Sequence, residues 1–233
     1  MTPAPIHIAG ERLLLDPDGA VVWPAEHLLA VADLHFEKGS SAACKGSLLP
    51  PWDTHATLDR LAGLIRRHSP RIVVALGDSF HDSTASDRLT LGDADRVRAI
   101  TASVRFVWVL GNHDPHPPRG LGGEAHGSWS LGPLRFRHEA RGRAATDGVE
   151  LCGHHHPKAQ VVTRGTNVTR PCFVVDAHRI MLPALGAYTG GLDVRAPAIA
   201  GLFPRGGRAF LLGRDRLFSF TLGQLTEGLL TGV

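Results

Sequence analysis

The sequence predicts an α/β fold of the α+β kind, with two β-sheets face to face and helices packed outside them. In the first half of the chain, apolar runs alternate with stretches of helical periodicity, which is typical of a parallel sheet covered by helices. In the second half, short apolar runs follow one another without a convincing helix, which favours a second, mostly antiparallel sheet. No repeat or long linker divides residues 1–233, so we expect a single domain.

The first elements are predicted to be a hairpin and a buried strand. Residues 12–15 and 21–23 are strand-like and are separated by the turn sequence Asp-Pro-Asp-Gly at residues 16–19. Residues 28–32, Leu-Leu-Ala-Val-Ala, are continuously apolar. A run of this kind predicts a strand that is buried on both faces.

A helix is then expected, capped by Asp53 or Thr54 and ended by Pro70. Its inward face is predicted from apolar residues at helical spacing, namely Leu58, Leu61, Leu64 and Ile65. Residues 71–76 form the next apolar run and predict a second buried strand.

A second helical region is expected within residues 85–103 and leads into a strand at residues 104–110. Gly92 argues against one unbroken helix in this region. The inward positions are predicted to be Leu89, Leu91, Val97 and Ile100. In the second half, the strand-like runs are residues 134–138, 149–152, 160–162, 172–175, 179–182, 210–212 and 217–220.

The composition excludes several classes of protein. The 43% hydrophobic content argues against disorder, and no stretch approaches the ~20 apolar residues of a membrane span. The first residues lack the pattern of a signal peptide, so we expect a cytoplasmic protein without a membrane partner. Cys44, Cys152 and Cys172 show no paired spacing, so a disulfide framework is not expected; the latter two lie in strand-like runs and are predicted to be buried thiols.

Five short polar motifs come at or just after the ends of apolar runs. They are Asp33-Leu34-His35, Gly77-Asp78, Gly111-Asn112-His113-Asp114, His138 and Gly153-His154-His155-His156. Asp and Asn oxygens and imidazole nitrogens are ligands for divalent metals. In an extended chain, Asp33 and His35 would point to the same side, and the His154-x-His156 spacing would repeat that geometry.

Any one of these motifs alone is better explained as a cap, a turn or a surface histidine. All five together, each at a strand end, predict a site for two adjacent divalent cations. His113 is left over as a candidate proton donor, which favours a hydrolytic enzyme over a simple metal-binding protein.

The order of these motifs resembles the calcineurin-like metallophosphoesterases, which implies that family's sandwich of two sheets. Further likeness to the ligase-associated DNA damage response endonuclease PdeM group extends over roughly residues 26 to 193. It is carried by residues 33–41, 48–51, 77–82, 153–157, 170–173 and 182–186.

The resemblance implies a role for each residue of the site. Asp33, His35 and His156 would hold the first metal. Asn112, His138 and His154 would hold the second, and Asp78 would bridge the two. His113 would protonate the leaving group. His138 is a single-residue motif, and His126 is the alternative for that place.

The chain departs from the wider superfamily beside the bridging residue. Many members carry an acidic residue three positions after the bridging Asp, whereas this chain has His81 there and Asp82 one position later. Two hypotheses follow: Asp82 orients His113, or His81 contacts the substrate. An ordinary loop salt bridge is the competing explanation for Asp82.

The donor set suits Mn, Fe or Zn, and the resemblance favours two Mn²⁺ ions. It also implies a DNA substrate, single-stranded or distorted, and partners among ligase-associated repair proteins. Arginines at positions 135, 137, 141 and 143 surround His138, and Arg137 in particular is a candidate phosphate contact. A solvated edge strand is the alternative explanation. A nucleotide or small-molecule phosphatase is the rival function, whereas a non-catalytic scaffold is disfavoured because every ligand is present.

Overall fold

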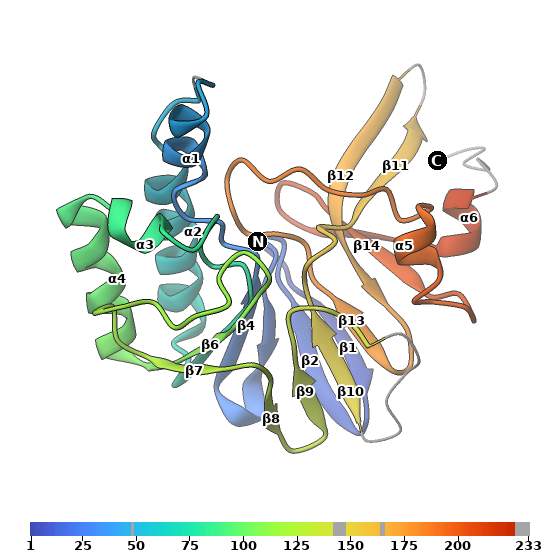
Figure 1. Cartoon of the computed structure of the whole chain (residues 1–233). Helices are drawn as coiled ribbons and strands as arrows, with labels where there is room; N and C mark the ends of the chain where they lie inside the picture. Colours follow the sequence, from blue (N-terminus) through green and yellow to red (C-terminus); the bar gives the residue numbers. More distant parts are fainter. Residues whose placement is uncertain (48, 142–147, 164–165, 227–233) are drawn as a thin grey trace.

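The structure is a computed structural model that describes residues 1–47, 49–141, 148–163 and 166–226, and it contains two β-sheets that lie face to face (Figure 1). The first sheet has the strand order β1-β2-β3-β4-β5-β6-β7. Its strands are β1 (Ala4–Ile8), β2 (Glu11–Leu15), β3 (Val21–Trp23), β4 (Leu28–Ala32), β5 (Ile72–Leu76), β6 (Arg105–Val109) and β7 (Glu124–His126). β1 to β4 pair antiparallel, and β4 to β7 pair parallel.

The second sheet has the order β15-β14-β12-β13-β10-β9-β8, with β11 paired to β12. Its strands are β8 (Trp129–Leu131), β9 (Leu134–Phe136), β10 (Val149–Cys152), β11 (Lys158–Thr163), β12 (Thr166–Val175), β13 (Arg179–Met181), β14 (Arg208–Leu212) and β15 (Leu217–Thr221). The expectation of a mostly antiparallel sheet is confirmed, except that β10 runs parallel to both β9 and β13.

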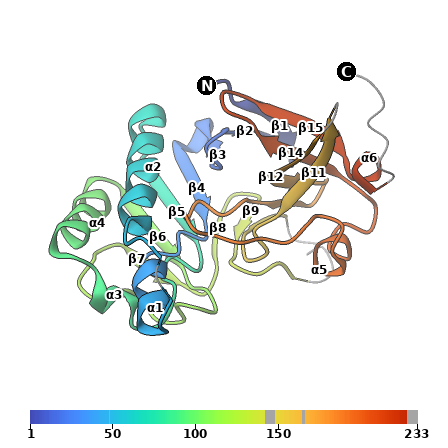
Figure 2. The same ribbon diagram turned by 90° about the horizontal axis from the view of Figure 1, so that it is seen from above.

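The helices lie outside the two sheets (Figure 2). Those beside the first sheet are α1 (Lys38–Cys44), α2 (Asp53–His68), α3 (Ala85–Arg88) and α4 (Leu91–Ser103), and a 3-10 turn (Pro24–Glu26) joins β3 to β4. Beside the second sheet lie α5 (Pro197–Ala200) and α6 (Leu222–Thr226). The predicted fold class is therefore confirmed.

Strand β4 shows why a continuous apolar run marks a central strand. Leu28 and Ala30 pack into the core between the two sheets, whereas Leu29 and Val31 pack against the helices. Successive side chains of a strand point to opposite faces, so a strand covered on both sides needs apolar residues throughout.

The predicted cap of α2 is wrong. Trp52 occupies the N-cap position without a side-chain hydrogen bond, and the helix already includes Asp53 and Thr54. Their side chains bind the preceding loop instead: Asp53 accepts from the amide of Gly39, and Thr54 accepts from the amide of Glu37. These two residues therefore anchor the segment that follows the first metal-binding motif.

The region from residue 85 to 103 is divided, as expected, although the break lies at Leu89 and Thr90 and Gly92 falls inside the second helix. α3 ends at Arg88, and α4 begins at Leu91 after Thr90, whose hydroxyl accepts from the amide of Asp93. Leu91 was expected to face inward, but it is 83% exposed because it is the first residue of a new helix. That expectation is wrong, whereas Val97 is buried as predicted.

Cys152 and Cys172 are buried, as expected, and burial raises the pKa of both thiols. Within the described ranges, no helix has the length and apolar character needed to cross a membrane.

Candidate metal centre

The first sheet contributes ligands from the carboxyl ends of three parallel strands. Asp33 and His35 follow β4, Asp78 follows β5, and Asn112 follows β6. Because β4, β5 and β6 are consecutive parallel neighbours, their ends meet at one edge of the sheet. This pairing brings together motifs that are separated by more than seventy residues in the chain.

The second sheet contributes its histidines from the parallel pair β9 and β10. His138 follows β9, and His154 and His156 follow β10. The amide of Gly153 donates to the carbonyl oxygen of His138, which ties the two loops together. The parallel pairing of β9 and β10 therefore places all three histidines at the same edge of the second sheet.

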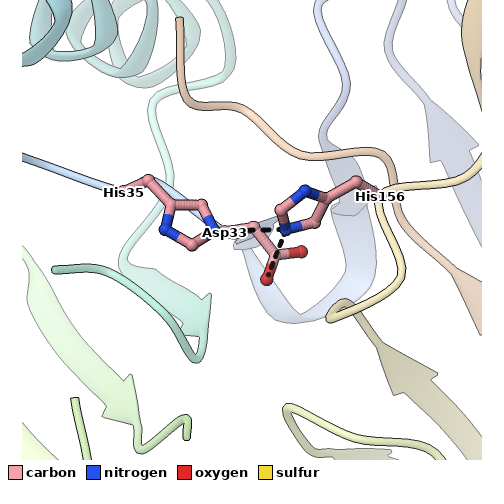
Figure 3. A group of neighbouring side chains, drawn as sticks. All are labelled: Asp33, His35 and His156. Atoms are coloured by element: carbon pink, nitrogen blue, oxygen red, sulfur yellow. Dashed lines mark hydrogen bonds and ion pairs between the residues drawn. The ribbon is translucent and has the colours of Figure 1, made fainter. Parts of the chain in front are cut away.

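The first group of candidate ligands consists of Asp33, His35 and His156 (Figure 3). The Nε2 atoms of His35 and His156 lie 3.2 Å apart, and Nε2 of His156 lies 3.5 Å from Oδ1 of Asp33. All three side chains converge on one point, although His156 comes from the opposite sheet.

The second group consists of Asp78, His138 and His154, with Asn112 beside them. Nε2 of His138 lies 3.3 Å from Oδ2 of Asp78, 3.0 Å from Nδ1 of His154 and 2.9 Å from Oδ1 of Asn112. Oδ2 of Asp78 also lies 4.0 Å from Nε2 of His35, a member of the first group. This carboxylate therefore lies between the two groups.

The chemistry and spacing of these donors fit divalent cations. Two atoms that each bind one ion at about 2.1 Å are roughly 3.0 to 3.5 Å apart in octahedral or tetrahedral geometry. The donor separations within each group fall in that range or slightly below it. Imidazole nitrogens that face each other without a shared proton or cation would repel, so the convergence itself favours bound ions.

Five of the candidate ligands have left-handed backbone conformations. The φ angles are 53° at Asp33, 45° at His35, 44° at Asp78, 70° at His154 and 46° at His156. Non-glycine residues rarely adopt this region, and strained conformations of this kind concentrate at functional sites. The turns aim each side chain at the centre at a cost in conformational energy.

These turns overturn the same-side argument made from the sequence. Neither Asp33 nor His35 is extended. His154 and His156 do not repeat a shared geometry, because His154 joins the second group and His156 joins the first. The alternation of an extended strand does not apply to a loop whose residues have positive φ.

Two motif glycines are required by close packing against the ligands. A Cβ atom at Gly77, where φ is 68°, would overlap the ring of His138, and one at Gly153 would overlap the carboxylate of Asp33. Glycine at these positions therefore lets a loop of one sheet approach a ligand of the other.

Asp114 has a structural role that the sequence left unassigned. Its buried carboxylate accepts hydrogen bonds from the amides of Gly111, Asp78, Ser79 and Phe80. Burial raises its pKa to about 6, against the effect of these hydrogen bonds. Asp114 thereby joins the loop after β5 to the loop after β6. The sequence signal for this role was its place at the end of the Gly111-Asn112-His113-Asp114 motif.

The electrostatics of the two groups differ. Burial, followed by the charge of His156, lowers the pKa of His35 to about 3. Burial opposes ionisation of Asp78 and His138, but their mutual hydrogen bond and charges prevail; they lower the pKa of Asp78 to about 2 and raise that of His138 to about 9. Asp78 and His138 thus form an ion pair, and a bound cation would replace the proton on the His138 ring.

His113 lies at the open side of the centre. Its Nδ1 lies 2.7 Å from the carbonyl oxygen of His81, a contact that requires a proton on Nδ1. Its Nε2 lies 3.9 Å from Oδ2 of Asp78 and faces the cluster. The His81 ring stacks on the His113 ring with centroids 5.3 Å apart.

The carboxylate of Asp82 is engaged elsewhere. Both of its oxygens accept from Arg88, and Oδ1 also accepts from Thr84. These hydrogen bonds, above all those from Arg88, lower the pKa of Asp82. This ion pair is the alternative to an orienting role for Asp82. Among the described residues, His113 is held by the carbonyl oxygen of His81.

The remaining candidates are placed as follows. His126 is half exposed on β7, beside Glu124, and belongs to neither ligand group. Arg137 and Arg141 line a cavity of about 270 Å³ with Asn112 and His138. Arg135 instead donates to carbonyl oxygens of its own turn. Arg143 lies outside the described residues, as does Leu48 of the quoted likeness.

Two clustered groups of carboxylate and imidazole ligands at the edge of a two-sheet fold are typical of hydrolytic enzymes that use two metal ions. The chain belongs to the calcineurin-like phosphoesterase family, whose model matches residues 27–165. The family resemblance predicted from the sequence is therefore confirmed.

Solved structures and curated proteins that are similar to this chain include the following three. Pseudomonas putida nuclease MPE is 32% identical, with a TM-score of 0.73 over 93% of this chain and 100% of that chain. The E. coli phosphoesterase Yfce is 14% identical, with a TM-score of 0.42 over 84% and 98% of the two chains. Probable inactive purple acid phosphatase 29 of Arabidopsis thaliana is 31% identical over 91 residues, which are 37% of this chain and 23% of that protein. The chain thus matches less than a quarter of that relative's length, whereas its similarity to nuclease MPE supports the predicted PdeM-like grouping.

Proposed function

We propose that this protein hydrolyses phosphodiester bonds within DNA with two Mn²⁺ ions, as an endonuclease of DNA repair. The observation that carries the proposal is the placement of Asp78 between two ligand groups, with His113 beside it. Similarity to a nuclease along nearly the whole chain supports DNA as the substrate. We infer further that residues 1–233 act as one domain, because each ligand group draws on both sheets.

Each ligand has a defined part in this proposal. Asp33, His35 and His156 would hold one cation, Asn112, His138 and His154 would hold the other, and Asp78 would contribute to both. The cations would supply Lewis-acid activation of the phosphate and of the attacking water. Histidine, carboxylate and amide donors without thiolate also accept Fe or Zn.

His113 is the proposed proton donor to the departing alkoxide. With Nδ1 bound to the carbonyl oxygen of His81, the other nitrogen, Nε2, is the one that exchanges a proton at the centre. The His81 ring stacks against it and is exposed enough to contact a phosphate. Asp82 affects His81 and His113 only indirectly, through the loop that its ion pair with Arg88 holds in place.

The first test separates an endonuclease from a nucleotide phosphatase. Metal-stripped protein is incubated with each cation and with circular single-stranded DNA, linear duplex DNA or mononucleotides. Nicking of the circle, which has no ends, is the expected result, with little release of phosphate from mononucleotides. Hydrolysis of nucleotides with an intact circle would support the rival phosphatase. Repair partners would then be sought by co-purification with DNA ligase.

The second test concerns His113. His113→Asn is expected to keep both cations and to lose roughly 100- to 10,000-fold of the activity on DNA, whose leaving group needs a proton. Activity on bis(4-nitrophenyl) phosphate should change little, because nitrophenolate leaves without one. Metal content measured by mass spectrometry is the control, and near-normal DNA cleavage would remove His113 from the acid role.

A further inference from the structure

A second cavity opens beside the metal centre, on the side of the first ligand group. It has a volume of about 150 Å³ and is lined by residues that include His156, Lys158, Arg60, Gly186 and Thr189. The cavity that holds Arg137 shares Asn112 and His138 with the second ligand group. One cavity adjoins the first ligand group through His156, and the other adjoins the second through Asn112 and His138, so they lie beside different ends of the cluster of ligands.

Lys158 is built into the metal-binding loop, yet its ammonium has no partner among the described residues. It is the first residue of β11, two positions after His156, and its amide and carbonyl groups bond Leu192 and Val194. Its stem runs along Gly191, where a Cβ atom would meet it. Within the described ranges, its ammonium makes no hydrogen bond or ion pair, and its charge helps to lower the pKa of nearby Lys38, after the larger effect of burial.

Arg137 has the matching position at the other end. It directly precedes His138, and its side chain is 18% exposed. Nε lies 3.5 Å from Oε1 of Glu150, a carboxylate already bound by Arg179 and the amide of Arg141. Nε is buried without a hydrogen-bond partner among the described residues. Glu150 therefore holds the guanidinium only loosely, and Arg137 lines the cavity beside Asn112 and His138.

The other cavity near the centre differs in charge. It has a volume of about 270 Å³ and is lined by three carboxylates, those of Asp82, Asp87 and Asp114, along with Arg119 and His116. The Lys158 cavity has no carboxylate in its lining, and the Arg137 cavity has one, Glu139. A polyanionic strand would therefore follow the Lys158 and Arg137 cavities and avoid the acidic one.

We infer that Lys158 and Arg137 bind the phosphates on either side of the phosphodiester that is cut, so that the substrate is a strand continuing past the metal centre in both directions. This inference rests on the proposed function. It assigns Lys158 to a phosphate subsite and makes an internal DNA linkage the preferred substrate over a terminal or isolated one.

The experiment compares the thymidine dinucleotides TpT, pTpT, TpTp and pTpTp, with bis(4-nitrophenyl) phosphate as a diester without flanking phosphates. In the unaltered protein, the terminal phosphates are expected to raise kcat/KM. Lys158→Met keeps the apolar stem and should lose roughly ten-fold in kcat/KM on pTpTp but not on the aryl diester. Arg137→Met should show the same loss of kcat/KM, and the double variant should cleave pTpTp with nearly the same kcat/KM as TpT.

Two further measurements distinguish a lost phosphate contact from a general loss of activity. The slope of log KM against log salt for a single-stranded oligonucleotide should fall by about one in each variant, and Lys158→Arg should restore most of the loss. Arg170→Ala is the matched control, because it removes one exposed charge from the same β11–β12 ribbon. Arg170 lies opposite Ala159, and its side chain is therefore on the other face of the ribbon from that of Lys158.

The outcomes separate the inference from the function on which it rests. If the unaltered protein cuts oligonucleotides but terminal phosphates and Lys158→Met have no effect, the subsite assignment is wrong. Equal losses on the aryl diester and on pTpTp would place Lys158 at the metal centre rather than at a flanking phosphate. If the unaltered protein hydrolyses only the aryl diester and nucleotides, the proposed function itself fails.

Discussion

The two sheets supply the metal centre in different ways. In the first sheet, three consecutive parallel strands end in Asp33, Asp78 and Asn112, and the order of strands in the sheet follows the order in the chain. In the second sheet, only β9 and its parallel neighbour β10 deliver ligands, within a sheet whose other pairs, apart from β10 with β13, are antiparallel. Parallel pairing, rather than the class of the whole sheet, brings strand ends together at a site.

The two sheets also differ in how they hold their ligands. The first sheet contributes both carboxylates, and the loops after β5 and β6 are joined through Asp114. The second sheet contributes three of the four candidate histidine ligands, on loops that pack against glycines of the first and second sheets. A change at Asp78 of the first sheet should therefore affect both cations, whereas a change at one histidine of the second sheet should affect one.

The largest effect is expected for Asp78→Asn. Its carboxylate lies between the two groups, and an amide cannot supply the same charge to both cations. We expect loss of at least one cation and a fall of about 1,000-fold or more in DNA cleavage, since metal activation is worth several kcal/mol. Metal content and cleavage rate are measured together. Retention of two tightly bound cations would show that Asp78 is not shared.

A smaller, one-sided effect is expected for His138→Ala. The second group should lose its cation while the first, which contains His35 and His156, keeps its own. Cleavage should fall by roughly 100-fold or more. His126→Ala is the matched control, because His126 is half exposed beside Glu124. Loss of metal in the His126 variant, with none in the His138 variant, would reverse the assignment.

An effect on stability without one on catalysis is expected at the antiparallel side of the first sheet. Asp16 is fully buried and binds Arg67 and His68 of α2. Asp16→Asn should lower the free energy of unfolding by about 2 kcal/mol, the scale of hydrogen bonds to a charged group. Urea unfolding measures this, and cleavage by the folded variant should be unchanged.

This variant also has a defined pH dependence. Burial opposes ionisation of Asp16, but hydrogen bonds from the amide of Asp18, His68 and Arg67 prevail and lower its pKa. The carboxylate therefore stabilises the fold above the ordinary Asp pKa of about 3.9. The difference between the variant and the unaltered protein should shrink as the pH falls below that value. A difference that grows in acid would contradict the ion-pair account.

The smallest effect is expected for Asp82→Asn. Because Asp82 binds Arg88 and Thr84, and His113 is held by the carbonyl oxygen of His81, activity should change by only about two- to three-fold. The pH profile of kcat should keep its shape. A shifted profile with normal folding would return Asp82 to the role of orienting His113.

Much of this arrangement was predictable from local patterns. Continuous apolar runs marked β4, β5 and β6, because strands covered on both faces need apolar residues throughout. Their polar endings then marked the edge of the sheet. The errors lie where a local pattern competes with distant contacts: Asp53 and Thr54 resemble helix caps but bind the loop at Glu37 and Gly39.

The sequence by itself determined the strand-and-helix order, the five polar motifs and the donor chemistry that they offer. The family resemblance implied which histidine joins which group. Only the tertiary structure decided how the backbone aims each histidine, that β10 lies parallel to β9, and that Lys158 and Arg137 line cavities beside the centre. The physical reason is that positive φ angles at residues such as His154 and His156 are held by packing between the two sheets. Such conformations are strained in isolation, so no local pattern reveals them.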